Sequence, residues 1–180
     1  MTKNFAAPLL AILFLASASQ AQDKVALTQL LKSEEAATTL ISELSAYDAK
    51  SPWATEVTWR LTQRLAVKGI KGPQITRAII AGGDIAAALD ADDRLFASIV
   101  WLTVGLLKEK DPEITLYDLE AIGVPAFEML AELLDRRADE IRKLARQGRL
   151  NSPAVFEALT TSYLLRYKGM AEKLAIKRAG

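Results

Sequence analysis

The sequence predicts an all-α protein, a single compact helical domain built around one buried central helix. Apolar residues recur at three- and four-residue steps, no stretch follows the two-residue alternation of a strand, and capping residues, prolines and glycines separate the periodic stretches. In addition, residues 95–107 form an uncharged run with apolar side chains on every side. Other elements must cover such a run to keep it from water.

The first 21 residues have the pattern of a secretory signal peptide. Lys3 supplies the basic start, residues 5–15 are apolar, and the small residues that follow predict cleavage after Ala21, or alternatively after Ala18. The apolar run is shorter than the roughly 20 residues that span a bilayer, which disfavours an uncleaved anchor. We therefore expect residues 22–180 to form one domain in the periplasm or outside the cell, with no membrane span after cleavage.

Amphipathic helices are predicted for the segment before residue 70. A short turn over residues 24–32 comes first. Ser33, which precedes two glutamates, is typical of a helix N-terminus, and this helix runs to about Tyr47. A Ser-Pro pair at residues 51–52 then predicts the N-cap and first position of a helix that Gly69 ends.

The central helix follows two short helical pieces. The first covers residues 72–81, a Gly-Gly-Asp turn is predicted at residues 82–84, and one more helical turn covers residues 85–89. The central helix spans about residues 91–109, with Asp90 as its N-cap. Lysines near its end suit the negative end of the helix dipole.

The C-terminal part predicts a short helix followed by a long helical hairpin. Residues 115–118 resemble a capping box, which would begin a helix ending at Ile122. Two long amphipathic helices, about 125–147 and 153–177, have matching apolar stripes and are joined by a few residues. A connection this short predicts that they pack antiparallel against each other.

Composition and charge describe an ordinary folded protein with an uneven charge distribution. Hydrophobic residues make up 51% and charged residues 25%. Residues 22–135 hold 11 Lys and Arg against 18 Asp and Glu, a balance of −7, whereas residues 136–180 hold 11 against 4, a balance of +7. This split suggests either two parts that attract each other or a basic face offered to an anion.

The absence of cysteine and histidine excludes more kinds of catalytic and metal-binding site than any other feature of the sequence. Disulfides, thiolate chemistry, the usual zinc, copper and haem ligand sets and Ser-His or Cys-His pairs all require one of these residues. The phosphate-binding loop and the S-x-x-K and G-x-S-x-G motifs are also missing from the sequence. We therefore expect no metal, no cofactor and no nucleophilic hydrolysis.

Carboxylates are the remaining candidate catalysts. Glu128 and Glu132 lie one helical turn apart, the arrangement of a possible glycan-cleaving pair. A simpler interpretation is that Glu128 favours the helix start and that Glu132 pairs with Arg136. The aspartates at positions 90, 92 and 93 lack the spacing of a calcium loop, and capping explains them.

Four residues are candidates for binding a partner. Arg142 and Arg146 share a helix face, Arg149 follows shortly after, and guanidinium groups bind phosphate, carboxylate or acidic protein surfaces. The alternative is a solvated face partly neutralised by Asp139. Trp59 lies off the apolar line of its helix and is a candidate interface anchor, whereas Trp53 and Trp101 are expected in the core.

Two main hypotheses about function follow. The first is a non-enzymatic envelope protein that binds another protein, as an accessory factor, a chaperone or an inhibitor of an envelope enzyme. The alternative is a binder of anionic lipid or peptidoglycan through the basic C-terminal hairpin, and a glycan-cleaving enzyme is a third. Export and a balanced mature charge argue against nucleic acid as the partner.

Overall fold

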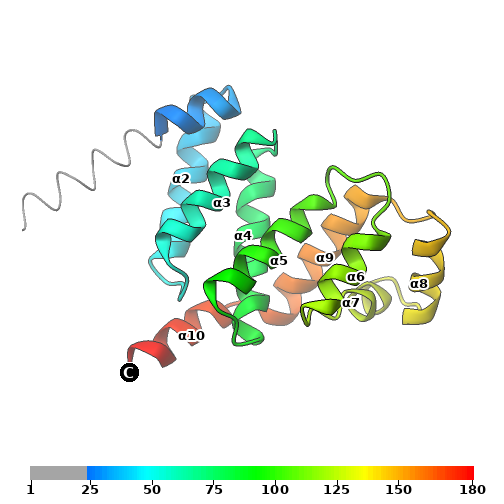
Figure 1. The fold of residues 1–180 in the computed structure, drawn as a ribbon. Coiled ribbons are helices and arrows are strands. Elements are labelled where there is room, and N and C mark those ends of the chain that lie inside the picture. The colour runs from blue at the N-terminus through cyan, green and yellow to red at the C-terminus, as the bar shows by residue number, and fades with distance from the viewer. Residues whose placement is uncertain (1–23) are drawn as a thin grey trace, which may run out of the picture.

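The computed structural model describes residues 24–180, so the expected signal peptide and its cleavage sites lie outside the described residues. Residues 24–180 form helices and loops without a strand, which confirms the all-α class. In this part of the chain, no helix is both long and apolar enough to cross a membrane. After a helical stretch at residues 24–31, the helices are α2 (Glu34–Asp48), α3 (Thr55–Val67), α4 (Gly72–Ala88), α5 (Asp93–Gly105), α6 (Glu113–Ala121), α7 (Ala126–Leu133), α8 (Ala138–Arg146), α9 (Ser152–Tyr167) and α10 (Met170–Ala179) (Figure 1).

Helix α4 lies at the centre of the packing, in contact with α2, α3, α5, α9 and α10. The predicted turn at residues 82–84 is wrong, because α4 continues through both glycines. A Cβ on Gly82 would lie 2.8 Å from Val100 Cγ2, and one on Gly83 would lie 1.7 Å from the Tyr47 hydroxyl. The glycines therefore allow neighbouring elements to approach the helix closely, without ending it.

The helix predicted at about 91–109 is present as α5 but is shorter, and its predicted central place is wrong, because α4 takes that place and Trp101, expected in the core, is only partly buried. Phe96, Ile99 and Val100 are fully buried, as its apolar pattern predicts. Its N-cap is Asp92, whose carboxylate accepts a hydrogen bond from Leu95 N at 2.8 Å, so the prediction of Asp90 was wrong. Asp90 instead has a positive φ of 51° in the turn after α4.

Other helix starts confirm some predicted caps and correct others. Ser33 accepts a hydrogen bond from Ala36 N at 3.1 Å, as expected for an N-cap. The Ser-Pro start at 51–52 is wrong, because α3 begins at Thr55 with Ala54 as its N-cap. Trp53, which precedes the helix, is buried and stacks on Phe96 with ring centroids 4.7 Å apart.

The predicted capping box at residues 115–118 is also wrong. Helix α6 begins at Glu113, and the Thr115 hydroxyl donates to the Glu109 carboxylate at 2.6 and 2.7 Å instead of capping the helix. Glu113 N donates a hydrogen bond to the side-chain carboxylate of Asp111, 3.0 Å away at Oδ1, which supports this earlier start.

The long C-terminal hairpin is wrong, because both of its helices break. Helix α7 ends where Asp135 adopts a φ of 50° and Arg136 N donates to Ala131 O at 2.9 Å, a hydrogen bond typical of a helix C-terminus. Helices α9 and α10 meet at Gly169, whose φ is 76°. As a result α8 packs on α6 and α7, and α8 and α10 lie at opposite ends of the molecule (Figure 1).

Candidate functional site: a groove between three helices

The candidate site is a groove that runs along α4 between α2 and α9. Three cavities of about 380, 260 and 220 Å³ follow one another along it. The first and second share Glu43 and Pro73, and the first and third share Ile80 and Leu164. Because adjoining cavities share lining residues, we treat them as one surface and call it the α4 groove.

Helical periodicity explains why these residues line one groove. On α4 the lining residues include Pro73, Arg77, Ile80 and Asp84, which are three or four positions apart and therefore lie on one face. At a rise of 1.5 Å per residue this face extends over roughly 16 Å. The α4 groove therefore has the length of about three helical turns.

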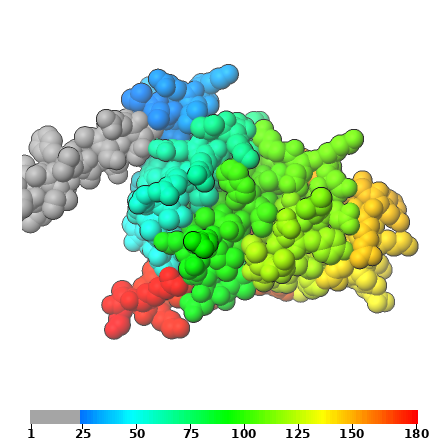
Figure 2. All heavy atoms as spheres, viewed as in Figure 1, coloured from blue at the N-terminus to red at the C-terminus, as the bar shows by residue number. Residues whose placement is uncertain are grey.

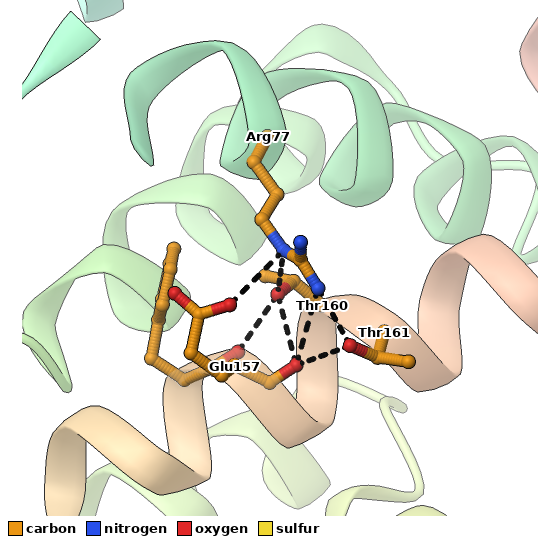
Figure 3. Close-up of polar contacts among 5 residues, drawn as sticks. Arg77, Glu157, Thr160 and Thr161 are labelled. Carbon is orange, nitrogen blue, oxygen red and sulfur yellow. Dashed lines mark hydrogen bonds and ion pairs between the residues drawn. The ribbon is translucent and has the colours of Figure 1, made fainter. Parts of the chain in front are cut away.

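Arg77 occupies the middle of the groove and links α4 to α9 (Figure 3). Its Nε donates to Thr160 Oγ1 and its Nη2 to Thr161 Oγ1, both at 2.6 Å, and Nε lies 3.6 Å from Glu157 Oε2. About a third of the Arg77 side chain, 34%, stays exposed. The guanidinium is thus held in a fixed orientation while part of it still faces solvent.

The rim of the groove is acidic at one end and carries charges of both signs at the other. Glu35 lies at the start of α2 and Glu43 in its second half, and Glu43 accepts a hydrogen bond from the Thr76 hydroxyl at 2.7 Å. Lys50 and Lys168 line the other end, where Lys50 lies 4.0 Å from Glu172. Between the ends the floor is apolar at Pro73, Ile80 and Leu164.

The end of the groove near Lys50 and Lys168 also contains a buried polar cluster. Asp84 accepts backbone hydrogen bonds from Gly169 N at 3.1 Å and Ala171 N at 3.0 Å, so it caps the start of α10. Burial raises the pKa of Asp84, and these backbone donors oppose the shift. Burial also raises the pKa of Tyr47, and the nearby Asp84 adds to this effect. Asp84 thus joins α4 to the start of α10, and both Asp84 and Tyr47 line this end of the groove.

The sequence-predicted arginines lie elsewhere, at the α8 end of the molecule. Arg142 Nη2 lies 2.6 Å from Glu128 and 3.1 Å from Glu120, and its guanidinium stands 5.1 Å from the centre of the Phe127 ring. Burial raises the pKa of Glu128, but the hydrogen bonds and the positive charge of Arg142, together with hydrogen bonds from the Glu128 backbone and Glu120, outweigh burial, so the pKa is lowered. The charge of Arg142 is therefore largely taken up by two internal carboxylates.

The remaining predicted residues do not gather into one site. Arg146 donates to the Tyr117 hydroxyl at 3.1 and 3.3 Å, and Arg149 is exposed beyond the end of α8. Trp59 is half-buried on α3, which packs against α2, α4 and α5, whereas α8 packs against α6 and α7. Trp59 and the three arginines therefore do not lie together on one surface that a single partner could contact.

The two candidate catalytic glutamates are held by different arginines. Glu128 pairs with Arg142, and Glu132 pairs with Arg166 of α9 and not with Arg136, as the sequence interpretation had it. Arg136 instead lies 3.8 Å from Glu140. Across residues 24–180, acidic residues form no group of three or more that could hold a metal ion.

Sequence analysis missed the α4 groove. Its signal was present in the apolar and polar positions 73, 77, 80 and 84, which have helical spacing. Reading the glycine pair at 82–83 as a turn removed the second half of that pattern. No protein-family model, curated protein or solved structure matches this chain, so function is argued from its own geometry.

Proposed function

We propose that this is an exported, non-enzymatic protein that binds another protein of the cell envelope, as an accessory factor, a chaperone or an inhibitor. The observation that carries the proposal is the α4 groove, an apolar floor with a charged rim that extends along three helices. The signal-like sequence of residues 1–21 supports the envelope location.

The shape of the groove favours an amphipathic helix as the docked segment. A groove between two helices on a third is the usual receptor for a helix that inserts its apolar face. A segment of about three turns matches the length of the floor. Complementary charge predicts basic residues over Glu35 and Glu43. At the other end Lys50 and Lys168 are balanced by Asp84 and Glu172, so that end favours neither sign of charge.

The test combines crosslinking with a matched pair of substitutions. A photo-crosslinking amino acid replaces Thr39, an exposed residue that lines the groove, in the organism that makes the protein. Ile80→Glu places a charge on the floor, and Ile114→Glu makes the same change on α6, where the side chain is 75% exposed. We expect a crosslinked partner that is lost with Ile80→Glu and kept with Ile114→Glu.

Two results would contradict the proposal. One is the absence of any crosslinked protein at Thr39, and the other is an equal yield with both glutamate variants. Circular dichroism and thermal unfolding of each variant show whether loss of crosslinking reflects loss of the fold. Crosslinking to a fragment of the partner that is helical when bound would support the helical mode of docking.

A further inference from the structure

A second surface, the seam between α3 and α5, gathers cations around a separate cavity. The cavity has a volume of about 220 Å³ and is lined by three arginines, one aspartate and the apolar side chains of Val57, Leu61 and Ala97. The arginines are Arg60, Arg64 and Arg94. Helices α3 and α5 pack against each other and both lie on the face turned to the viewer in Figures 1 and 2.

Helical spacing aligns further cations with this cavity. Arg60, Arg64 and Lys68 are four residues apart on α3, which places them along one stripe. Lys68 Nζ lies 4.2 Å from the ring centre of Trp101 on α5. The cationic stripe therefore follows the seam from the cavity to the half-buried Trp101.

Two of the three arginines are not neutralised. Arg60 pairs with Glu56, and Asp93 Oδ1 accepts a hydrogen bond from Ala54 N at 3.3 Å. Arg64 and Arg94 are exposed, and within residues 24–180 their guanidinium groups form no hydrogen bond or ion pair, since only their backbone carbonyls accept hydrogen bonds, from Lys68 N and Ser98 Oγ. This contrasts with Arg142, whose guanidinium is used by Glu120 and Glu128.

We infer that this cavity binds a phosphate group carried by a larger molecule, with Arg64 and Arg94 as its principal ligands. Guanidinium groups donate paired hydrogen bonds to phosphate oxygens, and two unpaired ones at the same cavity provide charge for a phosphate monoester. The cavity is smaller than the roughly 300 Å³ of the smallest usual small-molecule sites. It therefore takes the phosphate group and leaves the rest of the molecule on the surface, against the apolar wall.

The phosphate group can belong to a lipid headgroup or to a soluble molecule, and one experiment separates these sources. Binding of the full chain is measured by calorimetry for inorganic phosphate and glycerol phosphate. Co-sedimentation measures binding to phosphatidylcholine vesicles with and without phosphatidic acid. Binding to phosphatidic acid vesicles alone indicates a lipid headgroup, whereas binding to the soluble probes indicates a free phosphate compound.

A matched pair of double variants locates the site. Arg64→Gln with Arg94→Gln removes two positive charges from the seam, and Lys143→Gln with Lys173→Gln removes two from exposed positions on α8 and α10. We expect the first pair to weaken binding at least about tenfold, since each arginine supplies charge-assisted hydrogen bonds. The second pair should change affinity by less than about twofold, because it removes the same net charge but no side chain that lines the cavity.

Three outcomes would overturn the inference. The wild-type chain binds none of the four probes, the seam variant binds as tightly as the wild type, or both double variants lose affinity equally. The last result would mean that net charge, and not the seam, attracts the anion. Because the site is independent of the α4 groove, the Ile80→Glu variant should bind phosphate as the wild type does.

Discussion

Asp48 shows how a single buried charge affects this fold. Its two carboxylate oxygens are buried at the end of α2 without a hydrogen-bond partner of normal geometry. Burial raises the pKa of Asp48 to about 6, and the nearby Thr58 hydroxyl only partly opposes the shift. Since the ordinary value is 3.8, the folded chain binds this proton more tightly than the unfolded chain does.

The raised pKa predicts that wild-type stability falls as the pH rises from about 4 to about 7. In this window the unfolded chain has lost the Asp48 proton while the folded chain still holds it. Each unit by which the pH rises therefore lowers the free energy of unfolding. Asp48→Asn removes the ionisation and should be more stable than the wild type at pH 7.5 by roughly 1 to 2 kcal/mol, less than the full shift implies because the half-buried carboxyl is partly screened by solvent. Urea denaturation of both proteins at pH 4.5 and 7.5 measures the difference.

The exposed Asp118 provides a control for this prediction. Asp118→Asn also removes one aspartate, but from a surface position on α6, so it separates local burial from net charge. If Asp48→Asn follows the wild-type pH dependence in parallel, the Asp48 carboxyl is not the source of the effect.

Residue-level predictions from the sequence succeeded where the partner is local. Ser33 caps α2 because its hydroxyl only needs to reach an amide three residues ahead. Glu132 was assigned to Arg136 by the same local reasoning, yet it pairs with Arg166, which is brought close by the packing of α7 on α9. Tertiary contacts of this kind are not encoded in sequence spacing.

At the scale of whole helices, α10 depends on a side chain from α4. Asp84 accepts hydrogen bonds from Gly169 N and Ala171 N, two of the backbone amides that the start of α10 leaves without partners inside the helix. Gly169, at the N-cap position of α10, has no side chain that could take this role. The cap therefore comes from a residue that is distant in sequence.

We predict that Asp84→Ala loosens α10 more than the rest of the fold. Loss of both acceptors should raise hydrogen exchange of the α10 amides by about tenfold or more, equivalent to one lost capping interaction. Asp84→Asn keeps one acceptor oxygen and should give a smaller increase. Exchange measured by mass spectrometry on peptides from α10 and from α6 tests this, and equal changes in both regions would contradict a local cap.

The breaks in the C-terminal helices explain why the predicted hairpin failed. The apolar stripes of residues 125–147 and 153–177 continue across both breaks, so periodicity alone gives no sign of them. Asp135 tolerates a positive φ without being a glycine, and Gly169 lies in the middle of an otherwise helical pattern. Helix positions were thus largely predictable, whereas the directions in which the helices pack were not.

For the molecule as a whole, the net charge of a segment does not indicate where its arginines and lysines gather on the surface. Residues 22–135 have a balance of −7, yet Arg60, Arg64 and Arg94 of this segment line one cavity. Conversely, Arg142 of the basic segment lies against Glu120 and Glu128 of the acidic one. The attraction suggested by the charge split is therefore present at α8, whereas the cationic surface at the α3–α5 seam lies in the acidic segment and is not indicated by the split.

The position of α4 makes Gly83 a sensitive point of the fold. An alanine Cβ there would meet the Tyr47 hydroxyl at 1.7 Å and Trp53 Nε1 at 2.9 Å, and the Trp53 ring is buried and stacked on Phe96. Gly83→Ala gains helix propensity of about 1 kcal/mol, but the clash requires both rings to move. We expect a net loss of stability of roughly 2 to 4 kcal/mol.

Gly105→Ala is the matched control, because its Cβ would approach only the flexible end of Glu109, at 3.4 Å. This variant should be as stable as the wild type or slightly more stable, since alanine favours the helix and restricts the unfolded chain. Unfolding is followed by tryptophan fluorescence in a background with Trp59→Phe and Trp101→Phe, so that the signal comes from Trp53 alone. Because α4 contacts five other helices, Gly83→Ala should also lower the midpoint recorded by circular dichroism by the same amount. A shift in fluorescence without one in circular dichroism would mean that α2 and the Trp53 loop move away locally and that α4 does not join the helices into one cooperative unit.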